Sequence, residues 1–247
     1  MAFVINNLKD NSNVAITDQL GGFTVLEYIT DLSCTSVAAA KDNYYMSKSN
    51  MRRKQLMIEI NNSEIMMRAG AMQYTVGSME MTTGVKGVGG LMRNLVSGAV
   101  TGTGAIKPHY KGTGTIMLEP TYQYIWLIDV DNDDIAIEDG LFLACDTTLD
   151  ISVVARSNLS SAALGGEGLF NLSARGKGVL ALQAPIPSDE AVVIELQNDV
   201  LKVDGNFALC GPTPYSSPSK NREKPKWARP LPAKGWLMYT GEPELYG

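Results

Sequence analysis

The chain has one histidine and three cysteines, the residue types that most often act as nucleophiles, proton carriers or metal ligands. A Ser/His/Asp or Cys/His arrangement would have to use His109, and a histidine-rich metal site is impossible. Cys34, Cys145 and Cys210 form no Cys-x-x-Cys pair, and their odd number and wide spacing are typical of reduced thiols in the cytoplasm. We expect the cysteines to be buried small hydrophobes and His109 to face solvent or to have a packing role.

Two further segments are similar to ligand-binding loops without meeting their requirements. Residues 84–93, GVKGVGGLMR, lack the Gly-Lys-Ser/Thr ending that a phosphate-binding loop needs. Residues 129–134, DVDNDD, begin like a calcium loop, but Asp134 stands where the loop needs glycine and Gly140 where it needs glutamate. No spacing of Asp and Glu selects a pair for acid/base catalysis. We therefore predict a protein that is not an enzyme, with no catalytic residue, no cofactor and no metal site.

Composition restricts the class of protein further. The chain has 247 residues with 45% hydrophobic content, which is enough to bury a large core. Its net charge of -5 opposes the positive field that nucleic-acid backbones require, so we expect no nucleic-acid partner. The N-terminus lacks the continuous apolar region of a signal peptide, and no apolar run reaches the roughly 18 residues of a membrane span. We expect a cytoplasmic protein with no transmembrane segment.

Three segments of the chain repeat one pattern. They read IEINNSEIMMRAGA from Ile58, IDVDNDDIAIEDGL from Ile128 and IELQNDVLKVDGN from Ile194. Each has two runs of alternating apolar and polar residues around a polar centre, which predicts a β-hairpin. A glycine follows the second run in every copy, and its recurrence predicts a backbone angle that a Cβ would penalise. These glycines are Gly70, Gly140 and Gly205.

A second similarity relates two glycine-rich segments. Residues 167–182, EGLFNLSARGKGVLAL, align with residues 103–118, TGAIKPHYKGTGTIML. In both, an apolar pair precedes a short segment, a Gly-x-Gly sequence and a further strand, which predicts a tight hairpin turn at the glycines. The aligned glycines are Gly104, Gly112 and Gly114 in one segment and Gly168, Gly176 and Gly178 in the other.

These repeats predict an all-β protein of internally repeated antiparallel β-sandwich units about a pseudo-threefold axis, with few short helices. A unit of this length could hardly stand alone, so we expect residues 1–247 to form a single compact protein. The approximate repeats are 51–120, 121–185 and 186–247, and residues 1–50 add strands such as FTVLEYI. Short helices or helical turns are expected at 36–46, 91–100 and 157–164.

Four strings of residues resemble a known family across about residues 50–209: RAGAM, GGLMRNLVSG, GGEGLFNLSARGKGVLALQ and VDGNFAL. The family is that of the bacterial relatives of fungal proteins named for altered inheritance of mitochondria (mitochondrial biogenesis). Its fold is grouped with the tryptophan RNA-binding attenuation protein, so the resemblance implies a TRAP-like, all-β, oligomer-forming protein without established catalysis. The eukaryotic members are associated with mitochondrial inner-membrane organisation. No catalytic residue can be carried over.

We therefore predict a protein of unknown biochemical activity that acts as a non-enzymatic, self-associating β scaffold. It would form a homo-oligomer and present a surface to an unknown protein or membrane-associated partner. The alternative is a module that binds a small ligand or RNA in the grooves between repeats.

The third repeat departs from the other two after Leu209. Residues 210–247 contain seven prolines in 38 positions and no periodicity, which is typical of a linker rather than a strand pair. A one-base deletion near Leu209 would explain this departure. Codons can be chosen for residues 233–247 so that the frame beginning at the third base of the Ala233 codon reads EGLVNVYRGTG, a close copy of residues 167–178.

The nucleotide sequence of the gene tests this frameshift hypothesis. We expect the alternate frame from Ala208 onward to encode LMWSDSLQFT, which copies the strand ending in Leu149 and Ile151, and then EGLVNVYRGTG. The basic run at 220–227, KNREKPKW, would then have no evolved nucleic-acid role. A coding sequence whose alternate frame yields neither peptide would reject the hypothesis.

Overall fold

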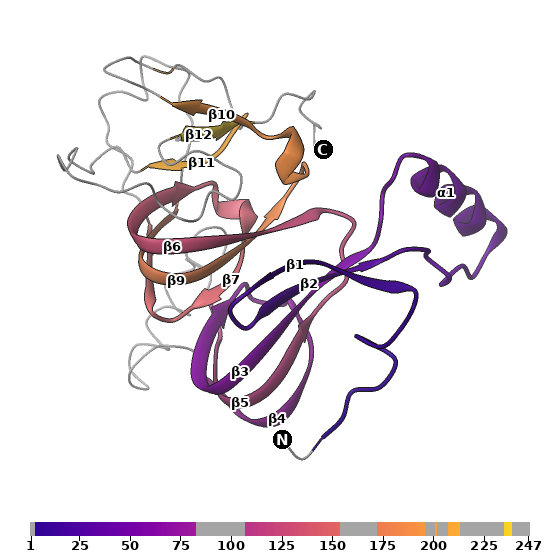
Figure 1. Cartoon of the computed structure of the whole chain (residues 1–247), viewed down its shortest axis with the longest axis horizontal. Helices are drawn as coiled ribbons and strands as arrows, with labels where there is room; N and C mark the ends of the chain where they lie inside the picture. Colours follow the sequence, from indigo (N-terminus) through magenta and orange to yellow (C-terminus); the bar gives the residue numbers. More distant parts are fainter. Residues whose placement is uncertain are drawn as a thin grey trace, which may run out of the picture.

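The computed structural model of the chain describes residues 3–82, 107–153, 172–195, 201, 207–212 and 235–238. In these ranges it is an all-β protein with a single α-helix, which confirms the predicted fold class (Figure 1). The strands are β1 (Val14–Leu20), β2 (Phe23–Tyr28), β3 (Lys54–Met67), β4 (Met72–Thr82), β5 (His109–Leu118), β6 (Tyr124–Ile137), β7 (Phe142–Asp146), β8 (Leu149–Val153), β9 (Leu172–Ala184), β10 (Val192–Glu195), β11 (Ala208–Pro212) and β12 (Gly235–Met238). The helices are α1 (Val37–Lys48) and the short 3-10 helices η1 (Asp139–Leu141) and η3 (Ser188–Glu190).

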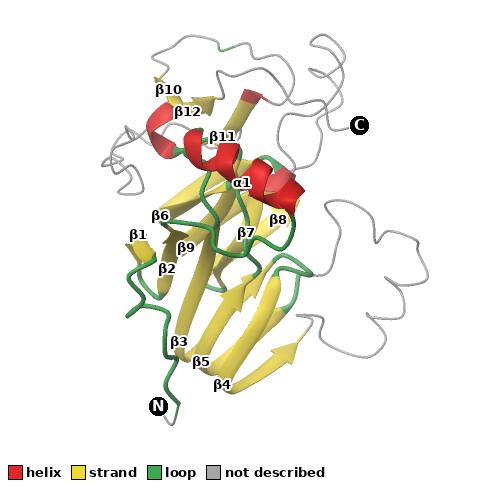
Figure 2. Cartoon of the chain, turned by 90° about the vertical axis from the view of Figure 1, so that its right-hand side faces the viewer, coloured by secondary structure: helices red, strands yellow, loops and turns green. Residues whose placement is uncertain are grey.

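All strand pairs in the described ranges are antiparallel and belong to one curled sheet. Its main order is β1-β2-β3-β7-β9-β6-β11-β12-β10, with β4 and β5 attached through β3 and β8 attached to β9. Figure 2 shows β3, β5 and β4 side by side. The short strand β7 joins the pair β3–β5 to the pair β6–β9, because Cys145 faces Met66 of β3 on one side and Leu180 of β9 on the other.

The polar centres of the first two repeats are bulges within continuous strands. β3 runs through Asn62 and β6 runs through Asn132 without a break, and the register with the partner strand skips each asparagine. Their φ angles are 49° for Asn62 and 59° for Asn132, values that are unusual for most residues but that asparagine tolerates well. One such residue adds twist without reversing the chain, because the ladder continues on both sides. The hairpins predicted from Ile58 and Ile128 are therefore wrong.

The Gly-x-Gly sequences lie in the middle of strands opposite these bulges, and the tight turns predicted there are also wrong. Gly112 of β5 pairs with Ser63, and Gly176 of β9 pairs with Asp133. Gly112 has a φ of +142°, and a Cβ there would lie 2.2 Å from the carbonyl oxygen of Ser78 in β4. Glycine is needed because the neighbouring backbone occupies the space of a side chain. Gly114 and Gly178 lie in the same two strands.

The other predicted turn glycines have different surroundings. Gly70 lies in the turn after β3 with a φ of +78°, whereas Gly140 lies in η1 and has no positive φ. The positive φ angle predicted for this glycine is therefore present in the first repeat, at Gly70, and absent from the second, at Gly140. Gly104, Gly168 and Gly205 lie outside the described residues. The pairs β3–β5 and β6–β9 share one bulged arrangement, but threefold repetition and the sandwich arrangement stay predictions.

Two large apolar clusters stabilise the curled sheet. One contains Phe23, Ile58 and Ile116 and is built mainly from β2, β3 and β5. The other contains Trp126 and Leu180 and is built mainly from β6, β7 and β9. Full burial of one such side chain contributes about 1.5–3 kcal/mol to the stability of the fold. β7 contributes to both clusters, through Leu143 and Ala144 to the first and through Phe142 and Cys145 to the second.

Helix α1 forms where residues 36–46 predict a helix. The hydroxyl oxygen of Ser36 caps it by accepting a hydrogen bond of 3.1 Å from the Ala39 N–H. No residue of α1 is buried, and the helix stands to one side of the sheet (Figure 1). The helical segments predicted at 91–100 and 157–164 lie outside the described residues.

The tail contains a strand where the sequence predicts none. β12 pairs with both β10 and β11, with Leu237 facing Val193 on one side and Cys210 on the other. The prediction that residues 210–247 contain no strand is therefore wrong for Gly235–Met238 and for the part of β11 beyond Leu209. The short apolar sequence GWLM suits a strand because its neighbours supply backbone partners on both edges.

We predict that Gly112→Ala destabilises the fold by about 2 kcal/mol or more, because the new Cβ meets backbone atoms of β4 and φ is positive. Thermal unfolding followed by circular dichroism measures this loss as a lower Tm. Gly140→Ala is the matched control, since its Cβ would meet only the flexible Glu138 carboxylate at 3.1 Å. Equal Tm values for the two variants would contradict this account of the strand glycines.

We also predict that one thiol reacts rapidly in the native protein. Cys145 and Cys210 are buried, but Cys34 is exposed, so the expectation of buried cysteines is wrong for Cys34. Burial raises the pKa of both buried thiols, to about 12 for Cys210, so neither forms the reactive thiolate near neutral pH. A chromogenic disulfide reagent should therefore titrate Cys34 quickly and all three cysteines only in denaturant, and Cys34→Ser should remove the fast phase. Fast labelling that survives Cys34→Ser would contradict the buried positions.

Candidate functional site

A cavity of about 240 Å³ lies between the turn after β3 and the segment that connects β5 to β6. Four apolar residues lie beneath its lining, namely Leu56 from β3, Leu118 from β5, Ile125 from β6 and Leu143 from β7. These four residues are buried in the fold. The cavity therefore lies where the two bulged strand pairs meet at β7.

The turn that carries Arg68 has a conformation set by its glycine. The Ala71 N–H donates to the Arg68 carbonyl oxygen at 3.2 Å, and Gly70 occupies the third position with a φ of +78°, as a type II turn requires. The Arg68 N–H donates to the Leu143 carbonyl oxygen at 2.8 Å, and the Glu119 N–H donates to the Ala71 carbonyl oxygen at 2.8 Å. These bonds fix the turn against β7 and the end of β5, with Arg68 lining the cavity.

The guanidinium of Arg68 is held by one side chain. Its Nη2 donates to Oε1 of Gln183 at 2.5 Å, and Nε2 of Gln183 donates to Oγ1 of Thr121 at 3.1 Å and to Oε1 of Gln123 at 2.7 Å. Burial lowers the pKa of Arg68 and the negative charge of Glu119 opposes this effect, so the group stays a cation. Arg68 forms no ion pair within the described part of the chain.

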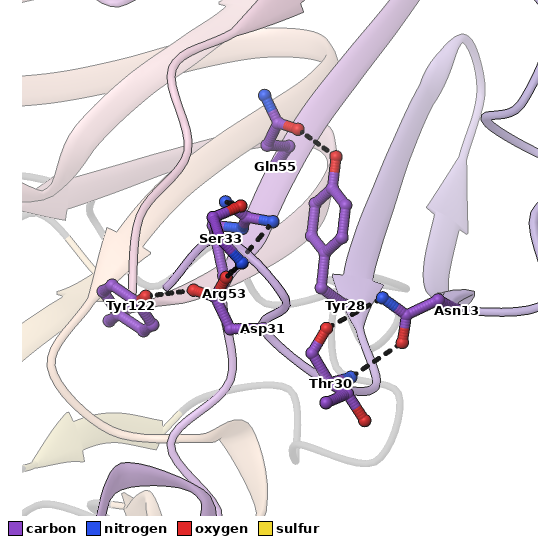
Figure 3. A network of polar contacts seen from close by, with 8 residues as sticks. All are labelled: Asn13, Tyr28, Thr30, Asp31, Ser33, Arg53, Gln55 and Tyr122. Carbon is purple, nitrogen blue, oxygen red and sulfur yellow. Dashed lines mark hydrogen bonds and ion pairs between the residues drawn. The ribbon is translucent and has the colours of Figure 1, made fainter. Parts of the chain in front are cut away.

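A polar network lies beside the connecting segment (Figure 3). The Tyr122 hydroxyl donates to Oδ2 of Asp31 at 2.5 Å, and Nη2 of Arg53 lies 3.6 Å from Oδ1 of the same carboxylate. Nη1 of Arg53 donates to Oγ of Ser33 at 3.2 Å. Burial alone would raise the pKa of Asp31, but the hydrogen bonds from Tyr122 and Ser33 and the charge of Arg53 lower it overall. Asp31 is thus an ionised anchor for the connecting segment.

The same network continues into β3 and to the end of β5. The Tyr28 hydroxyl donates to Oε1 of Gln55 at 2.7 Å, and the Arg53 guanidinium lies 4.2 Å above the centre of the Tyr28 ring. Nε2 of Gln55 donates to the Leu118 carbonyl oxygen at 3.0 Å. Asn13 joins the network through two hydrogen bonds to the backbone of Thr30 (Figure 3). The network therefore fixes the N-terminal strands to the segment that forms one side of the cavity.

The residues singled out from the sequence lie away from this cavity. His109 is partly buried at the start of β5, where its Nδ1 lies 2.8 Å from Oε1 of Glu64. Residues 129–134 form part of β6, and the Asp134 carboxylate accepts a hydrogen bond from Ser173 and pairs with Arg175. Residues 84–93 and 220–227 lie outside the described residues.

The cavity residues gave only a weak signal in the sequence. The string RAGAM contains Arg68–Ala71, which line the cavity. In the alignment of the first two repeats, Glu138 stands at the position that matches Arg68. Gln183 follows an apolar run and lies 115 positions from Arg68, so no local pattern connects the two.

No helix in the described ranges is both long enough and apolar enough to cross a membrane. A protein from Streptococcus pyogenes of known crystal structure is 18% identical to this chain, with a TM-score of 0.49, over 81% of this chain and 76% of that one. None of the curated proteins matches the chain.

A family model described as Mitochondrial biogenesis AIM24 matches residues 45–213. This match confirms the resemblance seen in the sequence, while the likeness to the attenuation protein stays a prediction. Because the matched residues make up well over half of the chain, the chain belongs to the AIM24 family.

Proposed function

We propose that the protein is a non-enzymatic β scaffold that self-associates through the free edge of β4. β4 is an 11-residue strand that pairs with β5 along its length. In the described part of the sheet, no strand occupies its other edge. The backbone N–H and C=O groups along such an edge are ready to pair with another strand. This open edge is the observation that carries the proposal.

The sequence of β4 favours pairing with another strand, because it lacks the residues that usually protect a free strand edge. Strand edges are commonly protected by lysine, proline or short length, but β4 has neither residue type and its only charge is Glu80. Its side chains include the exposed hydrophobics Met72, Tyr74 and Met81, the last with 63% of its surface accessible. Burial of these side chains against a partner would add apolar area to the backbone hydrogen bonds.

A second copy of the same chain is the partner that fits this edge. Two β4 strands can pair antiparallel about a twofold axis, so that each copy uses the same surface. Pairing centred on Gly77 would put Glu80 of one copy opposite Tyr74 of the other, which keeps the two carboxylates apart. Helix α1 offers further contact area, because a 12-residue helix with no buried residue is marginally stable alone in water. A protein or membrane-associated partner would then bind the assembled scaffold.

Light scattering coupled to size-exclusion chromatography tests the assembly. We expect a defined oligomer, and we expect Met81→Lys to raise its dissociation constant at least about tenfold, because a lysine on the edge must be desolvated on pairing. Val4→Lys is the matched control, since Val4 is exposed and lies outside the strands. Circular dichroism should show that both variants keep the wild-type fold.

A monomeric wild-type protein at working concentration would reject the proposal. An oligomer that Met81→Lys and Val4→Lys affect equally would place the interface elsewhere than β4.

A ligand-binding module is the second candidate function, and one specific observation favours it. The cavity brings the half-buried guanidinium of Arg68 together with the polar side chains of Thr121 and Gln183. This function is compatible with self-association, because β4 begins only after the turn residues that line the cavity.

A further inference from the structure

We propose that Met81 is a redox-sensitive site, at which oxidation by a peroxide blocks self-association through β4. This inference rests on the proposed pairing of β4 and adds its regulation, because the thioether allows pairing and the sulfoxide opposes it. The site consists of the Met81 side chain and the edge of β4 that no described strand occupies.

Methionine is concentrated at this edge. Three of the 11 residues of β4 are methionines, namely Met72, Met79 and Met81. Methionine is flexible and polarisable, so it suits surfaces that bind other chains. A mild oxidant converts its thioether into a polar sulfoxide. The same residue type therefore supplies contact area and a site of oxidation.

Accessibility selects Met81 among the methionines of the described part of the chain. Met81 is 63% exposed, and the next most exposed are Met51 with 44% and Met72 with 36%. Three methionines of the core have at most 1% of their surface accessible, namely Met57, Met67 and Met117. A peroxide in solution therefore reaches the thioether of Met81 readily and leaves the core methionines intact.

The oxidation step transfers one oxygen atom to sulfur. A lone pair of Sδ attacks the peroxide, the O–O bond breaks and an S–O bond forms. With hydrogen peroxide, the second oxygen leaves as hydroxide and takes up a proton to become water. The sulfur is oxidised by two electrons and the peroxide is reduced by two, so the step requires no further group of the protein.

The position of Met81 puts the new oxygen into the interface. Met81 pairs with Tyr110 of β5, whose side chain is buried in the cluster that contains Ile116. In the pairing centred on Gly77, Met81 of each copy would lie opposite Gln73 of the other, so both Met81 side chains become covered. A sulfoxide at this place must lose part of its hydration, and each dimer would carry two of them.

Assembly and oxidation therefore oppose each other. Met81 is accessible in the separate chain and covered in the dimer, so the peroxide reacts with the dissociated fraction. Oxidised chains associate less tightly, and the equilibrium moves toward separate chains. Reduction of the sulfoxide by a methionine sulfoxide reductase restores the thioether and, with it, the pairing.

Light scattering before and after peroxide treatment tests this regulation in the Cys34→Ser variant, which lacks the exposed thiol as a competing site. Peptide mass spectrometry identifies samples in which Met81 is a sulfoxide, and circular dichroism checks that the fold is kept. We expect the dissociation constant to rise at least about tenfold, and a methionine sulfoxide reductase to reverse the rise. An unchanged dissociation constant with Met81 oxidised, or loss of the fold, would overturn the proposal.

Two substitutions in the same background separate Met81 from the other exposed methionines. Met81→Leu keeps an apolar side chain of similar volume, so it should associate like the parent, and peroxide should no longer weaken it. Met51→Leu is the matched control, because Met51 is exposed but lies outside the strands, and this variant should stay sensitive to peroxide. Equal sensitivity of the two variants would contradict the role of Met81.

The rate of oxidation provides a second readout. Modification of Met81 should slow at least about fivefold as the protein concentration rises from below to well above the dissociation constant, whereas Met51 should react at one rate throughout. An oligomer in which Met81 reacts at a rate independent of concentration rejects this inference alone. A chain that is monomeric before any peroxide is added rejects the proposed function and this inference together.

Discussion

The rest of the structure depends on one backbone constraint, a single left-handed asparagine in each of the two longest strands. Asn62 and Asn132 are skipped by the ladder, and a glycine pairs beside each bulge on the partner strand. The added twist curves β3, so that β2 pairs along one end of its edge and β7 along the other. Without the bulge the strand would be straighter, and the side chains beyond it would change faces.

This curvature brings the two halves of the chain together at the cavity. Arg68 follows β3 of the first bulged pair, and Gln183 lies near the end of β9 in the second pair. Their hydrogen bond therefore connects β3 and β9, which the described part of the sheet joins only through the short strand β7. The network around Asp31 and Arg53 holds the connecting segment from its other side (Figure 3). The cavity is thus a product of the sheet geometry and not of a local motif.

Many strands could be predicted from the alternation of apolar and polar residues. Whether the chain reverses or continues at the polar centres around Asn62 and Asn132 could not. A left-handed asparagine occurs both in hairpin turns and in bulges, and only the partner strand decides between them. The same holds for Gly112 and Gly176, whose missing side chains admit a neighbouring backbone within a strand. The family string RAGAM contains Arg68 but assigns it no role, because its partner Gln183 is distant in the sequence and their contact depends on long-range strand pairing. In the tail, the sequence GWLM is too short to show an alternation of apolar and polar residues. Its pairing with β10 and β11 could therefore not be predicted from the sequence.

The shared strand β7 has a consequence for the energetics of the whole chain. Its central residues Leu143 and Ala144 belong to one apolar cluster, and the flanking residues Phe142 and Cys145 belong to the other. Neither cluster can lose this strand without exposing apolar surface of its neighbour. The two halves are therefore coupled as a cooperative folding unit, in which damage to either half lowers the free energy of unfolding of both.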